Sequence, residues 1–427
     1  MSGAERIPLA DHVADALALL APVRRRETVG LDRELVGRVA AAEARARVDV
    51  PGHDNSQMDG YALASADLAA ARRAGGDGAA ATLPLGPTIA AGDRPGTLDP
   101  ATARPIMTGA PIPAGADLVI PVEESAAGSF EAGAAGAEQV GAVTLSPDAL
   151  DPGRFVRRRG SDTRCGDTVL RVGQTLTPAR IAHLAACGTG AVEVEAPLRV
   201  IVLSTGSEIA AGGAVPEAAG VFDANGPGLA AALTAAGAEV VARGVVPDDV
   251  GALVAQLRDQ VAVHDADLIV SSGGVSAGAF EVVRHAADDD GVTMAFPTVA
   301  LQPGGPQGIG TLDLPERRVP WLAFPGNPVS ALLSCELIAR PALGAPPRTR
   351  LRLPLRLEAP EPSPPALEQY RRARVLPSGG VRLVGGASSH LIGGLAAADA
   401  LVLVPVGLDT IRDGDVLETL LIPGGDS

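Results

Sequence analysis

The feature that most constrains the fold of this chain is an alternation of strand and helix patterns that begins at Leu198. The apolar run LRVIVL leads into a Ser/Gly loop, a helical pattern covers about 226–236, and the apolar run AEVVARGVV follows. A second round of helix and strand comes next. Strands that alternate with helices pair in parallel, so this order predicts an open, mostly parallel α/β sheet. Ligands bind such sheets in the crevice beyond the carboxyl ends of the strands.

The second round adds detail to this prediction. Asp248 is expected to cap a helix, and a strand of the fully buried type follows at 267–270. We expect another helix around 280–287 and another strand over 319–324. The apolar face of the helix after Asp248 comprises Val250, Leu253, Val254, Leu257 and Val261.

The N-terminal part of the chain carries helical patterns. Apolar spacing predicts one helix over 11–20 and a second over 31–44, which must end before Pro51. Thr177-Pro178 offers a cap and a first-position proline for a helix that ends near Gly188. We expect this helix to rejoin the first domain.

Two other regions have β character. From about 53 to 150, short apolar runs such as 117–122 predict a small β domain, with a flexible loop over 126–142. After a Pro-rich passage, the runs VRLVGG and ADALVLVPVG predict a small C-terminal β domain. The predicted domains are 1–52 with 151–197 (N-terminal, two segments), 53–150 (inserted, β), 198–345 (α/β) and 350–427 (C-terminal, β).

Composition limits the partners. The 427 residues carry a net charge of −15, which repels polyanions, so nucleic acid is not an expected partner. Arginine clusters at 157–159 and 371–374 could bind small anions or lie on solvated faces. The three distant cysteines favour a reducing compartment, and the first 20 residues resemble neither a signal peptide nor a membrane anchor. We therefore expect a cytoplasmic protein without a membrane segment.

The segment PGHDNSQMDGYA, residues 51–62, combines turn-forming residues with two carboxylates. Asp, Asn, Ser and Gly favour turns and local side-chain hydrogen bonds. Such a loop could hold a metal or position a phosphate, and on its own a capped turn is an equally good interpretation.

Three further loops follow strands of the predicted sheet: STGSE from Ser204, SSGGVSAG from Ser271, and PGNPVS from Pro325. Glycines let backbone amides approach a phosphate, and hydroxyls add donors. One such loop is usually an ordinary turn. Three at the ligand-binding end of one sheet favour an anion-binding site.

The motifs DNSQMDGYA, IMTGAPIP, STGSE, SSGGVSAG and FPGNPVSA, in this order, resemble the molybdopterin molybdenumtransferase (MoeA) family, which is related to the gephyrin E domain. The resemblance covers nearly the whole chain. It implies four domains, the first of them elongated, with the α/β domain binding molybdopterin. It also implies a homodimer and an active cleft shared between subunits. The implied reaction inserts molybdate into adenylylated molybdopterin, with Mg²⁺-dependent release of AMP, and other molybdenum cofactor biosynthesis proteins could be partners.

Residue roles follow from the resemblance, motif by motif. It implies a catalytic set of Asp59, Thr108, Asp162, Glu208, Asp248 and Glu281. It implies that Mg²⁺ is held by some of Asp59, Glu208, Asp248 and Glu281. It assigns cofactor binding to Ser204, Thr205, Gly206, Asp223, Ser272, Gly273, Gly274, Ser276, Gly278, Pro325, Gly326, Asn327, Arg372 and Ser389. For Asp248, capping a helix is at least as good an interpretation.

Two departures from the family pattern matter. Glu281 stands where the family has Asp, so the carboxylate sits on a longer arm. Family lysines are replaced by neutral Thr298, Gln302 and Gly305. Because loss of one preorganised donor to an anion costs roughly 10²- to 10³-fold in rate, an arginine must compensate or activity must fall. The alternative function is a catalytically weakened molybdopterin-binding scaffold or carrier.

Overall fold

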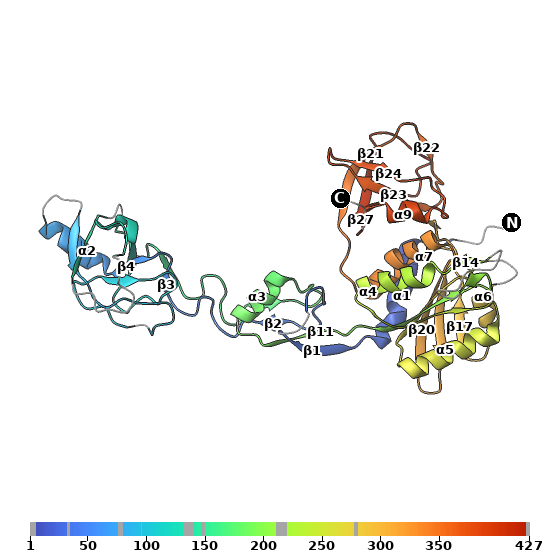
Figure 1. The fold of residues 1–427 in the computed structure, drawn as a ribbon, viewed down its shortest axis with the longest axis horizontal. Helices are drawn as coiled ribbons and strands as arrows, with labels where there is room; N and C mark the ends of the chain where they lie inside the picture. Colours follow the sequence, from blue (N-terminus) through green and yellow to red (C-terminus); the bar gives the residue numbers. More distant parts are fainter. Residues whose placement is uncertain are drawn as a thin grey trace. The chain divides into compact units, whose positions relative to one another are not determined.

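The computed structural model describes residues 6–31, 35–75, 80–94, 96–130, 141–146, 150–210, 220–276 and 281–423. The chain divides into two compact units, and many of their elements are labelled in Figure 1. The first unit comprises 1–27, 37–39 and 194–427, and the second comprises 28–36 and 40–193. The finer four-domain division stays a prediction. Among the described helices, none has the length and apolar character needed to cross a membrane.

The first unit contains the expected α/β sheet. Its order is β15 (Glu239–Val246), β12 (Arg199–Thr205), β16 (Leu268–Ser272), β20 (Arg318–Phe324), β19 (Gly308–Asp313) and β17 (Val292–Ala295). The first four strands are parallel, and β19 and β17 extend the sheet antiparallel. The prediction of an open, mostly parallel sheet is therefore confirmed.

Helices cover both faces of this sheet, as Figure 1 shows for α4 (Asn225–Ala235) and α5 (Val250–His264). Successive residues of a strand point to opposite faces. Accordingly Val200 packs in one core with Leu229 of α4, whereas Ile201 packs in another with Leu257 of α5. The same unit contains α1 (Leu9–Leu20), α6 (Val282–Ala286), α7 (Pro328–Ser334), α8 (Arg340–Ala342), α9 (Ile392–Ala396), the 3-10 turn η1 (Ala21–Val23) and the π-helical turn η3 (Cys335–Ala339).

Two helix predictions need correction. Asp249, not Asp248, caps α5: its Oδ1 accepts a hydrogen bond from the Ala252 N–H at 2.7 Å. The helix expected over 31–44 is absent from the described part of that segment. There the Ala40 N–H donates to the Gln174 carbonyl rather than to a carbonyl one turn back, so the buried apolar residues lie in irregular chain.

Other helix predictions are confirmed. The helix expected over 11–20 is α1, and the helix after Thr177 is α3 (Pro178–Ala186), with the Thr177 side chain accepting from the Arg180 N–H at 3.3 Å. The helix expected around 280–287 is observed as α6, with residue 280 outside the described part.

The C-terminal residues form a closed β structure within the first unit. Its ring is β23 (Glu368–Val375), β24 (Val381–Leu383), β21 (Arg350–Arg356), β27 (Val416–Leu421) and β25 (Ala400–Val404), which pairs back to β23; β18 (Leu301–Gln302) adds at the edge. Only β21–β24 is a parallel pair within this ring. The predicted C-terminal β structure is therefore confirmed. The first unit also contains the small pairs β13 (Ile209–Ala210) with β14 (Val221–Phe222) and β22 (Glu361–Pro362) with β26 (Thr410–Ile411).

The second unit is built from small sheets, as expected for 53–150. It contains β6 (Arg104–Ile106), β4 (Gly60–Leu63) and β7 (Leu118–Pro121) in one sheet and β5 (Ala81–Pro84) with β8 (Ala142–Leu145) in another. Its two-stranded pairs are β2 (Ala44–Arg45) with β10 (Thr168–Leu170) and β3 (Asn55–Ser56) with β9 (Val156–Arg157). β1 (Arg26–Gly30) pairs with β11 (Ala191–Glu195), and each of these two strands contains residues of both units. It also contains α2 (Ser65–Ala74), which the sequence did not predict, and the 3-10 turn η2 (Val122–Glu124). Of the loop expected over 126–142, residues 131–140 lie outside the described part, and Ala142 begins β8.

Candidate functional site

The three loops singled out by the sequence follow neighbouring parallel strands. Ser204 of β12 lies opposite Ser272 of β16, which lies opposite Phe324 of β20. Parallel strands present their carboxyl ends at one edge, so the loops that follow them converge there. The sheet topology thus brings together three segments that are far apart in sequence.

The backbones of these loops approach each other so closely that some positions have room only for glycine. Gly273 has a φ of +97°, and a Cβ there would lie 2.6 Å from the Thr205 carbonyl oxygen. Its N–H donates to the Phe324 carbonyl at 2.9 Å. A Cβ on Gly326 would lie 3.3 Å from the Gly273 Cα. A side chain at Gly273 would therefore push the first two loops apart.

Further hydrogen bonds tie the loops to the start of α4. The Ser204 hydroxyl donates to Asp223 Oδ1 at 2.8 Å, and Asn225 Nδ2 donates to the Gly326 carbonyl at 2.7 Å. The Thr205 hydroxyl donates to the Ser272 carbonyl at 3.2 Å. Asp223 and Ser204 thus act as a pair.

Two buried oxygens at this edge lack a partner among the described residues: Ser272 Oγ and Asn225 Oδ1. Buried polar atoms are nearly always hydrogen-bonded, so each of these two oxygens is a place where a water, an ion or a ligand can bind. A ligand that enters between these loops could form hydrogen bonds with both atoms. Ser272 lies opposite Ser204 in the neighbouring strand, and the Asn225 side chain donates to the Gly326 carbonyl of the third loop.

Other predicted residues have local roles. Asn327 caps α7, since its Oδ1 accepts from the Val329 N–H at 3.2 Å. Pro325 leads from β20 into this cap. Gly274 has a φ of +67°, and a Cβ there would meet the Val283 N at 2.8 Å. Gly206 is held by its N–H, which donates to the Val246 carbonyl at 3.1 Å. Gly278 lies outside the described residues.

Three acidic residues lie in or next to these loops. Asp248 Oδ2 accepts from the Ser207 N–H at 3.1 Å, and the Ser207 hydroxyl accepts from the Asp248 N–H at 3.0 Å. This reciprocal pair joins Asp248 to the loop that carries Glu208. Glu281 Oε2 accepts from the Ser276 N–H at 2.9 Å and so holds the second loop.

Few carboxylates at this site could bind Mg²⁺. Within the described ranges, no three His, Cys, Asp or Glu side chains gather into a metal cage. Mg²⁺ usually takes one or two carboxylates and completes its shell with water and substrate phosphate oxygens. Glu208 and Asp248, exposed and linked through Ser207, fit that pattern.

A second part of the site is a cavity of about 350 Å³. Its lining combines the 301–305 segment with Ser330 of α7 and Ser389 of the C-terminal β structure. Gln302 and Gly305, where the resemblance expects lysines, both line it. The chain contains no lysine, so all 35 basic side chains counted as Lys plus Arg are arginines. The neutral lining is therefore part of a chain-wide absence of lysine.

Arg372 lies behind the Ser389 side of this cavity. It is 5% exposed, and its Nη2 donates to the carbonyls of Gly386 and Ser388, the latter at 3.0 Å. Its Nε is buried and has no hydrogen-bond partner among the described residues. Burial, followed by the neighbouring Arg371 charge, lowers the pKa of the Arg372 guanidinium. A guanidinium in this setting is stabilised by an anion.

The second unit brings together two of the predicted residues. Asp59 Oδ1 accepts from the Thr108 N–H at 2.6 Å and from the Thr108 hydroxyl at 2.8 Å. The described contacts of Asp162 lie elsewhere, because its N–H donates to the Val50 carbonyl and its Oδ2 accepts from the Thr163 hydroxyl at 3.3 Å. Asp59 and Thr108 therefore form one pair, and Asp162 belongs to another local network.

Two of the arginines at 157–159 have structural partners. Arg158 pairs with Asp54 at 2.7 Å and Arg159 with Asp49 at 2.5 Å. Backbone hydrogen bonds, from Cys165 to Asp49 and from Arg159 to Asp54, are the main cause of the lowered pKa of each carboxyl, and the arginine pairs add to it. The second cluster is likewise bound: Arg371 pairs with Glu361 at 2.5 Å.

Sequence reasoning missed several residues around the cavity. Gln307 Nε2 donates to Ser334 Oγ at 2.8 Å, and Gln369 Nε2 donates to Gln302 Oε1 at 2.6 Å. Gln307 and Gln369 are buried. The sequence carries little signal for Gln369, which lies in the largely charged run LEQYRRARV, and no periodicity links that position to Gln302.

Comparison with known proteins gives consistent matches along the chain. Family models match residues 7–188 (MoeA N-terminal region, domain I and II), 201–345 (probable molybdopterin binding domain) and 354–422 (MoeA C-terminal region, domain IV). Molybdopterin molybdenumtransferase 2 of Mycobacterium tuberculosis is 40% identical over 395 residues, covering 90% of this chain and 92% of that protein. The Synechococcus elongatus molybdopterin molybdenumtransferase is 33% identical over 391 residues, with 89% and 91% covered. The crystal structure of the molybdopterin biosynthesis moea protein from Pyrococcus horikosii matches with a TM-score of 0.76 and 26% identity, over 98% of this chain and 100% of that one.

Proposed function

This chain belongs to the MoeA family of molybdopterin molybdenumtransferases, and from that premise we propose that it inserts molybdenum into adenylylated molybdopterin and releases AMP. It is a transferase of molybdenum cofactor biosynthesis. The observation that most supports the proposed site is the convergence of three strand-end loops around two unpartnered buried oxygens, Ser272 Oγ and Asn225 Oδ1.

We propose that the loops after β12, β16 and β20 bind the pterin and its adenylyl phosphate. Their glycines allow close approach of a ligand, and Ser272 and Asn225 add polar contacts. Glu208 and Asp248 would hold Mg²⁺ against the phosphate. A bound Mg²⁺ would neutralise charge on the departing AMP.

Molybdate, as the second substrate, would occupy the cavity lined by Gln302, Ser330 and Ser389. Hydroxyl and amide groups there can donate to its oxygens, and the buried Arg372 supplies positive charge behind the wall. Arginine keeps its charge at any working pH. The positive charge of Arg372 would replace the charge of the missing lysines, so molybdate could bind and react although the lining itself is neutral.

We further propose that the active form is a homodimer in a cytoplasmic setting, with the Asp59–Thr108 pair of one chain serving the loops of the other. The exposed Asp59 carboxylate would then act in catalysis in addition to accepting the hydrogen bonds from Thr108. Partners from the same biosynthesis could deliver the pterin substrate.

Neutral residues stand where the family has lysines, and this favours a second candidate function: a carrier that binds molybdopterin without loading metal. Purified protein incubated with adenylylated molybdopterin, Mg²⁺ and molybdate separates the two. The transferase releases AMP only when molybdate is present. Calorimetric binding of molybdopterin without molybdate-dependent AMP release would leave the carrier function in its place.

A further inference from the structure

A second cavity lies in the C-terminal β structure, outside the site described above. It encloses about 610 Å³ and is lined by Arg356 of β21, Arg382 of β24 and the segment that follows β21. Pockets that bind small ligands commonly measure about 300–1,000 Å³. The cavity is therefore large enough for a metabolite.

The two arginines are neighbours by strand register. Arg356 lies opposite Arg382 in the parallel β21–β24 pair, and Arg374 lies opposite Arg382 on its other side, in β23. Cross-strand partners point to the same face of a sheet, about 5 Å apart. Three arginines thus form a row across the sheet, and like charges on directly opposite residues destabilise a sheet.

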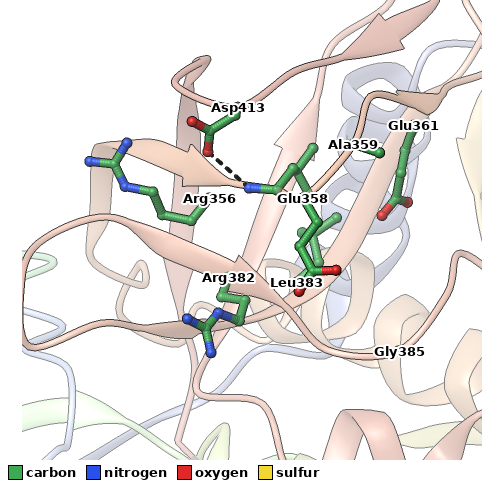
Figure 2. A pocket seen from close by; sticks show the side chains of 9 residues that line it. Arg356, Glu358, Ala359, Glu361, Arg382, Leu383, Gly385 and Asp413 are labelled. Atoms are coloured by element: carbon green, nitrogen blue, oxygen red, sulfur yellow. Dashed lines mark hydrogen bonds between the residues drawn. The ribbon is translucent and has the colours of Figure 1, made fainter.

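Two members of the row are available to a ligand. Arg374 Nε donates to the Ala397 carbonyl at 2.6 Å, so that side chain is engaged. Within the described part of the chain, Arg356 and Arg382 have no hydrogen-bond or ion-pair partner, and both are exposed. Figure 2 shows both side chains on the side of the cavity opposite Glu361, with their guanidinium groups extending in different directions. A guanidinium fork matches the oxygens of a phosphate group.

Acidic residues also line the cavity, and Figure 2 places Asp413 beside Arg356, and Glu361 on the opposite side. Glu361 pairs with Arg371, and Asp413 Oδ1 accepts from the Leu357 N–H at 3.0 Å, as the dashed line in Figure 2 shows. Glu358 also lines this cavity, and its carboxylate has no partner among the described residues. It can accept hydrogen bonds from hydroxyl or amino groups of a ligand.

We propose that this cavity binds a phosphorylated small molecule, with Arg356 and Arg382 holding the phosphate and Glu358 accepting hydrogen bonds from hydroxyl or amino groups of its body. Such a ligand would offset the repulsion within the arginine row. The site is separate from the loops and the Ser389 cavity assigned to molybdenum transfer.

The test uses ribose 5-phosphate as the probe, with inorganic phosphate and ribose as its two halves. Titration followed by hydrogen exchange should show protection in 350–357 and 381–385, with ribose 5-phosphate binding more tightly than either half. Arg356→Gln with Arg382→Gln should weaken its binding by about tenfold or more, because each charged hydrogen bond contributes strongly. AMP release by this double variant should equal that of the parent.

Two controls make the result specific. Arg352→Gln changes an exposed arginine of the same strand that does not line the cavity, and it should leave binding unchanged. The double variant should unfold at the same or a higher urea concentration, since it removes like charges from exposed positions. Equal affinity of parent and double variant, or no protection of these strands at millimolar probe, would overturn the proposal. Equal affinity for inorganic phosphate and ribose 5-phosphate would remove the role of Glu358.

Discussion

At the level of single residues, a substitution of Asp59 can show whether this residue has a catalytic role or only stabilises its turn. Both hydrogen bonds to Thr108 use Oδ1, which asparagine retains. Asp59→Asn should therefore leave the thermal midpoint nearly unchanged. It should lower AMP release by roughly 100-fold or more, because the carboxylate charge is lost.

Asp93→Asn provides the matched control for that variant. Asp93 is an exposed turn residue of the same unit, whose Oδ2 accepts from the Ala90 N–H at 2.7 Å. It should keep parental AMP release. Equal release by Asp59→Asn and the parent, at equal midpoint, would reduce Asp59 to a turn residue.

Substitutions of the neighbouring residues Asp248 and Asp249 should affect catalysis and stability separately. Asp249 caps α5, so Asp249→Ala should destabilise the first unit by about 0.5–2 kcal/mol with AMP release retained in the folded fraction. Asp248→Asn should have the opposite profile, with small loss of stability and strongly reduced AMP release. Urea unfolding and the AMP assay measure the two effects; a purely structural Asp248 would leave turnover intact.

At the scale of elements, the strands and helices that follow strong apolar patterns were predictable from sequence. β12, β16, β20 and α4 all appear close to their expected positions, because buried apolar runs leave few alternatives. The failed helix over 31–44 shows the limit. Its apolar residues have helical spacing, yet Ala40 finds its hydrogen-bond partner at Gln174, a tertiary contact that no local pattern encodes.

The candidate site was predictable to a similar degree. Glycine and serine loops at strand ends were visible in the sequence, and the sheet brings them together. The cavity beside Ser389 was not visible as a cavity, because it depends on β18 pairing with β23 across 67 residues of chain. Asp248 shows a finer limit: sequence spacing could not decide which of two adjacent aspartates caps α5.

Helix α1 provides a pH-dependent prediction. His12 is 1% exposed, and burial lowers its pKa below the ordinary 6.5, an effect that nearby Asp15 opposes. The folded chain therefore binds this proton less readily than the unfolded chain, whose imidazole takes it up as the pH falls through 6.5. Stability contributed by neutral His12 is therefore present above that pH and declines below it.

The comparison of parent with His12→Gln isolates this effect from the other histidines. Between about pH 7.5 and about pH 5.5, the urea midpoint of the parent should fall more than that of the variant. Identical pH dependence in the two proteins would show that His12 does not change protonation on unfolding.

At the scale of the whole molecule, the proposed active cleft requires two chains. Light scattering at micromolar concentration should give about twice the 42.8 kDa of one chain. A mass of one chain under conditions where AMP release is measured would contradict a cleft shared between subunits.

Molybdenum transfer coupled to AMP release can be followed in one experiment. A single-turnover reaction with adenylylated molybdopterin, Mg²⁺ and molybdate is sampled over time for AMP and for molybdenum bound to pterin. We predict that both products rise together in equal amounts and that neither forms without molybdate. AMP release without molybdenum-loaded pterin, or formation of neither product by folded protein, would contradict the proposed transfer.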